Sequence, residues 1–403
     1  MRIVIAGAGI GGLTAALALA RTGHDVVVLE RASAVSPLGA GLQISANARR
    51  VLVDLGLGDE FSSVATEPSR IVVRRWQDDA VLGESPLTGV HDALFGHAYA
   101  SVARNDLARI LVDAASRMQN VDLRFGTGVD NVTVEGPHVS VLSGGAIIEA
   151  EADAVVGADG IHSVVRAVVN GKDSPRFSGW AAYRAQVPRE RVDHLPAETT
   201  NRVGPGAHVV SYFIGRDRSH LNLVFIAPEA EWTGESWTEQ TSLESLRAAF
   251  DGWSGQLQQL IEAVEEPVYK WALYDREPLA TWCNGSVALL GDAAHPMLPF
   301  MAQGACQAIE DAAVLARCLT GPAMNPGETA RALKQYEATR MERATKIQSV
   351  SYFNRVVFHY PDGDEQRARD EMFGSDTWSR ATDWVYDHDP LTVPLVSGGT
   401  ELA

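Results

Sequence analysis

The chain begins with glycines whose spacing, Gly7-x-Gly9-x-x-Gly12, is typical of a loop that binds the pyrophosphate of a dinucleotide. The first glycine permits a tight turn, the second lets the backbone approach the phosphates, and the third lets a helix pack on a strand. The N-terminus of that helix offers unpaired N–H groups and a partial positive charge to the anion. Glu30 stands where a carboxylate that binds ribose is expected. These residues leave open whether the dinucleotide is FAD or NAD.

Two later segments have the pattern of an apolar strand followed by a tight turn. One is Ala158-Asp159-Gly160; the other is Leu289-Leu290-Gly291-Asp292, which is followed by Gln303-Gly304-Ala305 at the start of an apolar helix. Three such loops in this order indicate FAD. With FAD bound, a helix that starts near Gly304 would direct its N–H groups at a carbonyl of the flavin pyrimidine ring, and its positive pole would favour the reduced flavin.

The elements that position these loops can be predicted from the apolar pattern. Residues 2–6, 13–21 and 26–30 predict a strand–helix–strand unit, and strands at 154–157 and 287–290 lead to the two later turns. Strand-like runs dominate 178–274, with one helix at 242–253, and two helices are expected at 305–319 and 330–350. We therefore expect an α/β fold: a Rossmann-like FAD-binding domain interleaved with a mostly antiparallel β-sheet substrate domain, and C-terminal helices. The expected boundaries are 1–70, 100–177 and 275–350 for the first domain, 71–99 and 178–274 for the second, and 351–403 for a tail.

Composition excludes several classes of partner. Acidic residues outnumber basic ones by 51 to 34, a formal charge of −17, which argues against binding to nucleic acid or to an anionic membrane. The three cysteines form no C-x-x-C pair, so neither a disulfide framework nor a zinc site is expected, and buried cysteines in a reducing cytoplasm fit the pattern. Glycines and charged residues interrupt the apolar N-terminal stretch, and no other apolar run approaches the length of a membrane span. We expect a cytoplasmic monomer or homodimer with a small-molecule substrate and no bound metal.

The three loops together resemble the group A flavoprotein aromatic hydroxylases, which have the para-hydroxybenzoate hydroxylase fold. In that family the segment that matches Asp159-Gly160 contacts the FAD pyrophosphate and the nicotinamide cofactor, and the aspartate that matches Asp292 holds the ribityl hydroxyls. Arg104 matches an arginine that braces the FAD. The resemblance implies resident FAD, transient NADH or NADPH, and O₂. The residues expected to contact the cofactors are Gly7, Gly9, Gly11, Gly12, Glu30, Arg31, Gln43, Arg104, Asp159, Arg166, Gly291, Asp292, Gln303, Gly304 and Ala305.

Within that family the chain is most similar to salicylate and 3-hydroxybenzoate hydroxylases and to 6-hydroxynicotinate 3-monooxygenase. Segments that support this are Gly41–Gln43, Gly179–Arg184, Tyr274–Leu279, Phe358–Gly363 and Asp383–Tyr386. Salicylate-type relatives favour NADH. Gln43 matches a pocket residue of the hydroxybenzoate enzymes, whereas Pro299 and Phe300 stand where relatives have a pocket glutamine and histidine. These differences leave the substrate open, and no arginine can be assigned to a substrate carboxylate.

The stretch Gly204–Tyr212 matches the relatives' strand that carries a pocket histidine and tyrosine. On a strand His208 and Tyr212 face the same side, with Cα atoms about 13 Å apart, so they could flank opposite ends of one ring. His208 is assigned as the base and Tyr212 as a positioning group; the alternative is that both only pack the sheet. The family proline that matches Pro296 presents its backbone near substrate and flavin. The expected catalytic residues are His208, Tyr212 and Pro296, and the expected substrate-binding residues are Gln43, His208, Tyr212, Pro299 and Phe300.

The resemblance implies hydroxylation of a phenolic, hydroxybenzoate-like acid through a flavin hydroperoxide, ortho or para to the ring hydroxyl. A base activates the ring because a phenolate is far richer in electrons than a phenol. If the attacked carbon carries the carboxylate, CO₂ is lost, as in salicylate hydroxylase. Alternatives are a 6-hydroxynicotinate-type pyridine monooxygenase and a tailoring hydroxylase of an aminohydroxybenzoate or a larger phenolic metabolite. A flavin-dependent halogenase would require a W-x-W-x-I-P segment, which the chain lacks. A flavin-binding redox sensor would show no substrate-stimulated NADH oxidation.

Overall fold

A computed structural model of the chain describes residues 1–36, 40–135, 138–230, 232, 240–321 and 324–397. Its first large sheet has six strands in the order β18-β19-β11-β1-β2-β7, all parallel except β18. Every residue of β11 and all but the first residue of β1 are buried, as expected for a parallel sheet covered on both faces. The strands are β1 (Arg2–Ala6), β2 (Asp25–Glu30), β7 (Val121–Phe125), β11 (Ala154–Gly157), β18 (Cys283–Asn284) and β19 (Val287–Leu289).

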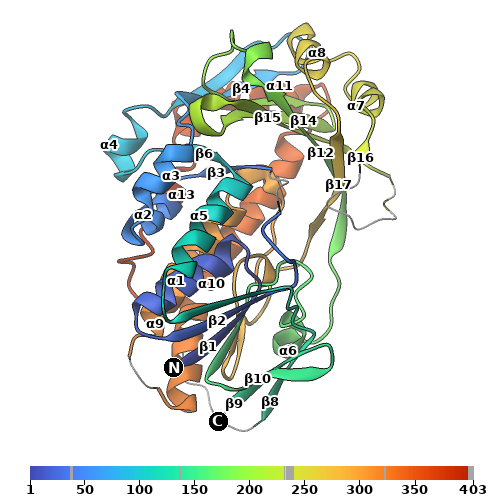
Figure 1. The fold of residues 1–403 in the computed structure, drawn as a ribbon. Coiled ribbons are helices and arrows are strands. Elements are labelled where there is room, and N and C mark those ends of the chain that lie inside the picture. Colours follow the sequence, from blue (N-terminus) through green and yellow to red (C-terminus); the bar gives the residue numbers. More distant parts are fainter. Residues whose placement is uncertain (37–39, 136–137, 231, 233–239, 322–323, 398–403) are drawn as a thin grey trace.

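The second large sheet has eight strands in the order β16-β17-β12-β15-β14-β13-β4-β5, and only the β13–β4 pair is parallel. Figure 1 shows the two sheets toward opposite ends of an elongated molecule. The β4–β5 hairpin begins one residue before the expected range 71–99. It lies in the same sheet as the later strands. The strands are β4 (Arg70–Arg75), β5 (Val81–Pro86), β12 (Arg176–Pro188), β13 (Thr199–Gly204), β14 (Ala207–Ile214), β15 (His220–Pro228), β16 (Gln240–Thr241) and β17 (Val268–Asp275).

The two faces of this second sheet have different partners, because side chains alternate along a strand. Val209 and Phe213 of β14 point to one face and join Leu246 and Leu257 of the covering helices in an apolar core. Residues 208, 210 and 212 point to the other face. That second face packs against Leu298, Phe300 and Phe358; it is named the pocket face because it carries His208 and Tyr212, which are predicted to line the substrate pocket.

Thirteen helices are described, together with four 3₁₀ turns, among the residues that the structure places. They are α1 (Ile10–Arg21), α2 (Ala46–Asp54), α3 (Gly58–Val64), α4 (His91–Phe95), α5 (Arg104–Ser116), α6 (Arg166–Asn170), α7 (Leu243–Ala249), α8 (Gly255–Glu262), α9 (Gly304–Cys318), α10 (Pro326–Val357), α11 (Asp364–Phe373), α12 (Asp376–Ser379) and α13 (Asp383–Tyr386). Two smaller sheets pair β3 (Gly41–Ile44) with β6 (Ala100–Ala103), and join β8 (Asn131–Glu135), β9 (His138–Ser143) and β10 (Ala146–Ala152).

The long helix α10 connects the two halves of the molecule (Figure 1). Leu333 and Tyr336, near its start, join the apolar core of the first sheet. Val357, at its end, packs against Val73 and Val203 of the second sheet. Pro326 follows the N-cap residue, and a capping box fixes that end.

The observed helices correct two expectations. The single helix expected at 242–253 is two helices, α7 and α8, separated by a turn in which Gly252 has a φ of +76°. Helix α10 begins earlier and ends later than the expected 330–350, so the expected boundary at residue 350 falls inside a helix. The α/β fold class itself is confirmed, whereas the domain boundaries stay a prediction.

Three further observations concern whole classes of site. Cys283, Cys306 and Cys318 are buried and free. No helix of the described chain is long and apolar enough to cross a bilayer. Within the same described residues, no group of three or more His, Cys, Asp or Glu side chains could hold a metal ion.

Candidate active site

The first glycine loop connects β1 to the beginning of α1 and leaves no room for side chains at three of its glycines. Gly7 has a φ of +102°, and a Cβ on it would lie 2.5 Å from the carbonyl oxygen of Ala158. A Cβ on Gly12 would lie 2.1 Å from the carbonyl oxygen of Gly7, whereas one on Gly11 would meet Leu290 at 2.6 Å. A Cβ on Gly9 would meet no atom within 4 Å. The loop is therefore tightly packed on its protein side and open at Gly9, where a pyrophosphate would approach.

Glu30 ends β2 beside this loop. Its carboxylate accepts hydrogen bonds from the N–H groups of Ala8 at 2.9 Å and Ala32 at 2.8 Å. These two bonds fix the carboxylate next to the glycine turn, and each oxygen keeps a lone pair for a ribose hydroxyl. The next residue, Arg31, is exposed, and its stem packs near Gly128.

The second loop follows β11. Oδ2 of Asp159 accepts a hydrogen bond from the N–H of Val164 at 2.8 Å, whereas its Oδ1 is buried with no partner among the described residues. Burial raises the pKa of this carboxyl. A buried oxygen without a partner is costly, so this position fits a ligand that donates a hydrogen bond.

Arg166 connects the second loop to the third. Its guanidinium donates to the carbonyls of Ala293 and Ala294 at 3.0 and 3.3 Å and forms an ion pair with Asp173. Arg166 is 2% exposed. The contacts of the side chain are therefore with protein, and its expected contact with a cofactor stays a prediction.

The third loop follows β19. Gly291 has a φ of +60° and donates its N–H to Asp311 at 2.9 Å. The side chain of Asp292 is open to solvent, yet the protein around it raises its pKa by desolvation, with Arg104 and His295 acting in the opposite direction. Asp292 is thus accessible to a ligand.

Helix α9 begins next to Asp292. A Cβ on Gly304 would lie 4.0 Å from Oδ1 of Asp292, and no side chain caps the first N–H groups of the helix. Gln303 is buried; its Nε2 donates to Oγ of Ser45 at 2.9 Å and its Oε1 accepts from Asn47 at 3.1 Å. The side chain of Gln303 therefore fixes the start of α9, while the backbone at Gly304 and the half-buried Ala305 carries the free donors.

A buried ionic network supports this helix from behind. Asp311 accepts hydrogen bonds from Nε2 of His295 at 2.6 Å and from Nε of Arg340 at 2.8 Å, besides the bond from Gly291. Glu310 pairs with Arg340 and Arg343. Burial opposes ionisation of both carboxyls, but the neighbouring cations outweigh it, and the pKa of each is lowered.

One face of α10 follows the chain from the third loop toward the second sheet. Nε2 of Gln348 donates to the carbonyl of Pro296 at 2.8 Å, Oγ of Ser351 donates to Leu298, and Nδ2 of Asn354 donates to Phe300 at 3.2 Å. The bond from Gln348 shows that the carbonyl of the buried Pro296 faces α10. The expected catalytic role of Pro296 stays a prediction. Pro299, in contrast, is exposed.

His208 lies on the pocket face of the second sheet and is joined to a second histidine. Its Nδ1 lies 2.7 Å from Nε2 of His359, and both residues are buried. The ring of His359 stacks on Trp180 at 5.4 Å, and the ring of Phe300 lies 5.1 Å from that of His208. Burial lowers the pKa of His208 well below its usual value and that of His359 to about 4.

Tyr212 and Gln43 form the other end of the same wall. The hydroxyl of Tyr99 donates to Oε1 of Gln43 at 2.5 Å, and Gln43 also interacts with the Tyr212 hydroxyl. A Cβ on Gly41 would lie 2.5 Å from the Tyr212 ring, so glycine is required there. Desolvation raises the pKa of Tyr212 to about 12, against the opposing effect of Arg184.

The structure thus adds three residues to those predicted: Tyr99, Arg184 and His359. Two of them lie in segments that carried the family resemblance, 179–184 and 358–363, but nothing in the sequence pattern assigned them a role. Tyr99 had no signal at all. All three meet the predicted residues only because separate elements converge: the residue before β6, strand β12 and the end of α10.

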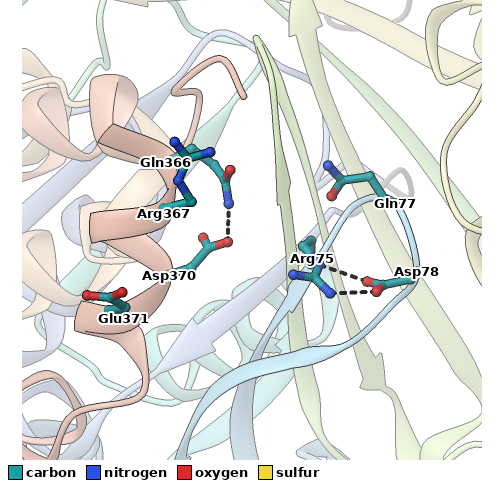
Figure 2. A pocket seen from close by; sticks show the side chains of 7 residues that line it. All are labelled: Arg75, Gln77, Asp78, Gln366, Arg367, Asp370 and Glu371. Carbon is teal, nitrogen blue, oxygen red and sulfur yellow. Dashed lines mark hydrogen bonds and ion pairs between the residues drawn. The ribbon is translucent and has the colours of Figure 1, made fainter. Parts of the chain in front are cut away.

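A surface cleft of about 560 Å³ lies elsewhere, between the β4–β5 turn and α11 (Figure 2). Its lining is charged, and Figure 2 shows Arg75 paired with Asp78, and Gln366 bonded to Asp370. None of the predicted site residues lines it. It is therefore separate from the three loops and from His208.

Comparison with known proteins agrees with this geometry. The family model of an FAD binding domain matches residues 1–351. The chain is 36% identical over 412 residues to 3-amino-4-hydroxybenzoate 2-monooxygenase PtnB3 of Streptomyces platensis, covering 97% of each protein. It is 35% identical over 402 residues to 6-hydroxynicotinate 3-monooxygenase of Pseudomonas fluorescens, covering 98% of this chain and 97% of that protein. The crystal structure of Klebsiella pneumoniae HpxO with FAD and uric acid matches with a TM-score of 0.82 at 26% identity, over 96% of both chains.

The resemblance to flavoprotein aromatic hydroxylases is thereby confirmed, and so is FAD as the cofactor, with O₂ and NAD(P)H as the co-substrates of such an enzyme. The three loops, the exposed Asp292 and the partnerless Asp159 oxygen fit that cofactor. This chain belongs to the family of FAD-dependent aromatic monooxygenases.

Proposed function

We propose that this chain hydroxylates a phenolic aromatic acid, with His208 as the base that activates the ring. The observation that carries the proposal is the buried His208–His359 pair on the pocket face of the second sheet, with Tyr212 farther along the same strand. The two relatives named above act on 3-amino-4-hydroxybenzoate and 6-hydroxynicotinate. Both names describe a ring with a hydroxyl and a carboxyl group, which supports a substrate of that class.

In this proposal Gly9, Glu30, Asp159, Asp292 and the start of α9 hold the FAD. When bound and reduced by NAD(P)H, FAD would activate O₂, one atom of which would be transferred to the ring while the other would leave as water. The protein's own part is to exclude water, orient the substrate and remove a proton from its hydroxyl.

The base is set up by the hydrogen bonds of the histidine pair. A neutral histidine carries a proton on one ring nitrogen only, and in this proposal the proton of His359 is on Nδ1, which leaves a lone pair on Nε2. His208 then donates its Nδ1–H to that lone pair. Its own Nε2 is left unprotonated and can accept the proton of a phenol.

Burial contributes to this arrangement in two ways. A histidine whose pKa is lowered stays neutral at neutral pH, so the lone pair of His208 is available throughout. Phe300 and Phe358 contact the His208 ring, and Trp180 covers His359. These rings keep water away from the reacting centre, which limits wasteful oxidation of the reduced cofactor.

The substrate screen that tests the proposal compares 3-amino-4-hydroxybenzoate, 4-hydroxybenzoate, 3-hydroxybenzoate, salicylate and 6-hydroxynicotinate. Wild-type holoenzyme is mixed with each acid and with NADH or NADPH, and NAD(P)H loss, O₂ uptake and product mass are measured together. We expect at least one acid to stimulate NAD(P)H oxidation and to yield a product with one added oxygen. Product mass also shows whether CO₂ is lost. Failure of every phenolic acid to yield oxygenated product would contradict the proposed function.

His208→Ala tests the role of the base directly. General-base catalysis contributes roughly 10²- to 10⁴-fold, so single-turnover product formation should fall by at least 100-fold while FAD stays bound. Flavin reduction by NAD(P)H should still occur, and the electrons should appear as H₂O₂. Product formed at the wild-type rate would show that His208 is not the base.

We further propose that the enzyme works in a reducing cytoplasm as a monomer or homodimer on a small-molecule substrate. The three buried, free cysteines support a reducing compartment. The net charge of −17 supports a partner other than nucleic acid.

A further inference from the structure

Arg184 lies on the same face of the second sheet as the proposed base. It pairs with Val224 of β15, which in turn pairs with Val210 of β14, the residue midway between His208 and Tyr212. Residues paired directly across neighbouring strands point to the same face, and two strand spacings amount to about 10 Å. A long side chain at position 184 can therefore reach the space between His208 and Tyr212.

The guanidinium of Arg184 has an unusual set of neighbours. It lies over the ring of Trp271 at 4.5 Å, and its Nε is buried with no hydrogen-bond partner among the described residues. Arg184 as a whole is half-buried, whereas the fully buried arginines of the described chain each pair with a carboxylate. Examples are Arg166 with Asp173, Arg202 with Asp79, and Arg340 with Glu310.

The surroundings of Arg184 contain an excess of positive charge. Burial lowers its pKa to about 10, and the charge of Arg104 acts in the same direction. The hydroxyl of Tyr212 acts in the opposite direction, but it is neutral at pH 7, since its pKa is raised above the already high value of a free tyrosine. A guanidinium in such a place is stabilised by an anion that arrives from outside.

We propose that Arg184 is the carboxylate-binding residue of the pocket and that it orients the aromatic acid with its hydroxyl toward His208. This inference rests on the proposed function and narrows the substrate class to rings with an anionic substituent. A planar guanidinium can offer two parallel N–H groups to a carboxylate, which fixes the direction of the ring as well as its charge. Trp271 supports the flat side of the guanidinium.

Other cations near the pocket are already engaged or differently placed. Arg355 donates to the Tyr352 hydroxyl and lies over that ring at 4.1 Å. Arg104 is exposed, and its charge opposes the rise in the pKa of Asp292, so it is assigned to the cofactor rather than to the substrate. Arg184 is the cation that remains for the substrate among the described residues of this face.

The test compares the substrate acid with its uncharged carboxamide. The acid is the best substrate of the five-member screen described above, and each ligand is titrated into holoenzyme while the visible spectrum of the flavin is followed. Arg184→Gln should raise the Kd of the acid about 100-fold and that of the carboxamide less than threefold, with FAD content unchanged. Arg184→Lys should give a Kd for the acid between those of wild type and Arg184→Gln, because lysine keeps the charge but lacks the paired N–H groups.

Lys270→Gln is the matched control. Lys270 is the neighbouring cation of the sheet, but it pairs with Tyr183 and Glu229 on the opposite face, so the Kd of both ligands should stay within threefold of wild type. Equal weakening of acid and carboxamide by Arg184→Gln, or no weakening of either, would overturn the inference. If the wild-type enzyme hydroxylates an acid and Arg184→Gln binds that acid with the wild-type Kd, only the inference about Arg184 is overturned and the proposed function stands. A wild-type enzyme that oxygenates no phenolic acid would overturn the proposed function itself.

Discussion

At the scale of single residues, the proposed role of His208 as a base depends on which of its two ring nitrogens carries the proton. His208 could present either ring nitrogen to the pocket, and only its neighbour decides. His359 comes from the end of α10, 151 positions away in the chain, and its ring is fixed by stacking on Trp180. The sequence predicted the strand and the face of His208, but not this partner, because no local pattern links two residues so far apart.

A pair of variants separates this tautomer role of His359 from simple packing. His359→Phe keeps an aromatic ring on Trp180 but removes the acceptor, so hydroxylation in a single turnover should slow at least tenfold. His359→Gln offers an amide oxygen in place of Nε2 and should restore part of the rate. The measurement is product yield per NAD(P)H at pH 6 to 9. Equal loss in both variants would mean that His359 acts only by filling space.

At the scale of elements, the strand–turn–helix units were the most predictable part of the fold. Glycines at fixed offsets and a continuous apolar strand fix β1, α1 and β2 locally, so the loop geometry follows from the residues themselves. The expected helix at 242–253 failed for an equally local reason: Phe250 and Trp253 are apolar in a helical pattern, but they fill the core from a turn. The apolar pattern could not distinguish residues that are buried in a helix from residues that are buried in a turn.

The first loop allows a matched pair of glycine variants. Gly12→Ala would place a Cβ 2.1 Å from a backbone oxygen, so we expect it to destabilise the fold and to abolish FAD binding. Gly9→Ala meets no protein atom within 4 Å and has an ordinary φ of −72°, so the apoprotein should keep its stability. Its Kd for FAD should nevertheless rise at least tenfold, because the methyl group points to where the phosphates approach. Urea unfolding and FAD titration of both variants check this, and wild-type affinity in Gly9→Ala would contradict the assigned pyrophosphate position.

The ionic network behind α9 makes a second prediction at this scale. Asp311→Asn removes a buried charge that accepts bonds from Gly291, His295 and Arg340, and leaves Arg340 with one carboxylate instead of two. Breaking a buried ion pair costs about 3–5 kcal/mol. We expect the free energy of unfolding to fall by that amount and FAD to dissociate more readily. Asp217→Asn, at a side chain that is 92% exposed, is the control and should change stability by less than about 0.5 kcal/mol.

At the scale of the whole molecule, the residues that could not be predicted are those contributed by a second sheet or a distant helix. Arg184 and Tyr99 are examples, since their roles follow from strand order and not from neighbours in sequence. The overall division into a parallel and a mixed sheet was predictable because apolar runs differ from the alternating pattern. Which faces of the sheets and helices pack together is decided by tertiary contacts, so it could not be predicted from the apolar pattern.

Acid stability is a property at this same scale. Burial lowers the pKa of six histidines, with His359 and His388 at about 4; the six are His24, His91, His97, His208, His359 and His388. The unfolded chain therefore binds more protons than the folded chain below pH 6.5, and stability falls as the pH drops from 6.5 toward 4. Thermal unfolding of the holoenzyme from pH 7.5 to 4.5 should show a Tm that declines within this window. His359→Gln should flatten the decline, and an unchanged slope would mean that His359 is not buried as a neutral ring.

Helix α10 has a mechanical consequence that none of its single contacts reveals. One continuous rod of 32 residues touches the support of the cofactor loop through Arg340, the backbone of residues 296–300 through Gln348, Ser351 and Asn354, and ends beside His359. A rigid rod transmits displacement along its length. We therefore expect that loss of the prosthetic group also disturbs the alignment of His208, the proposed proton acceptor.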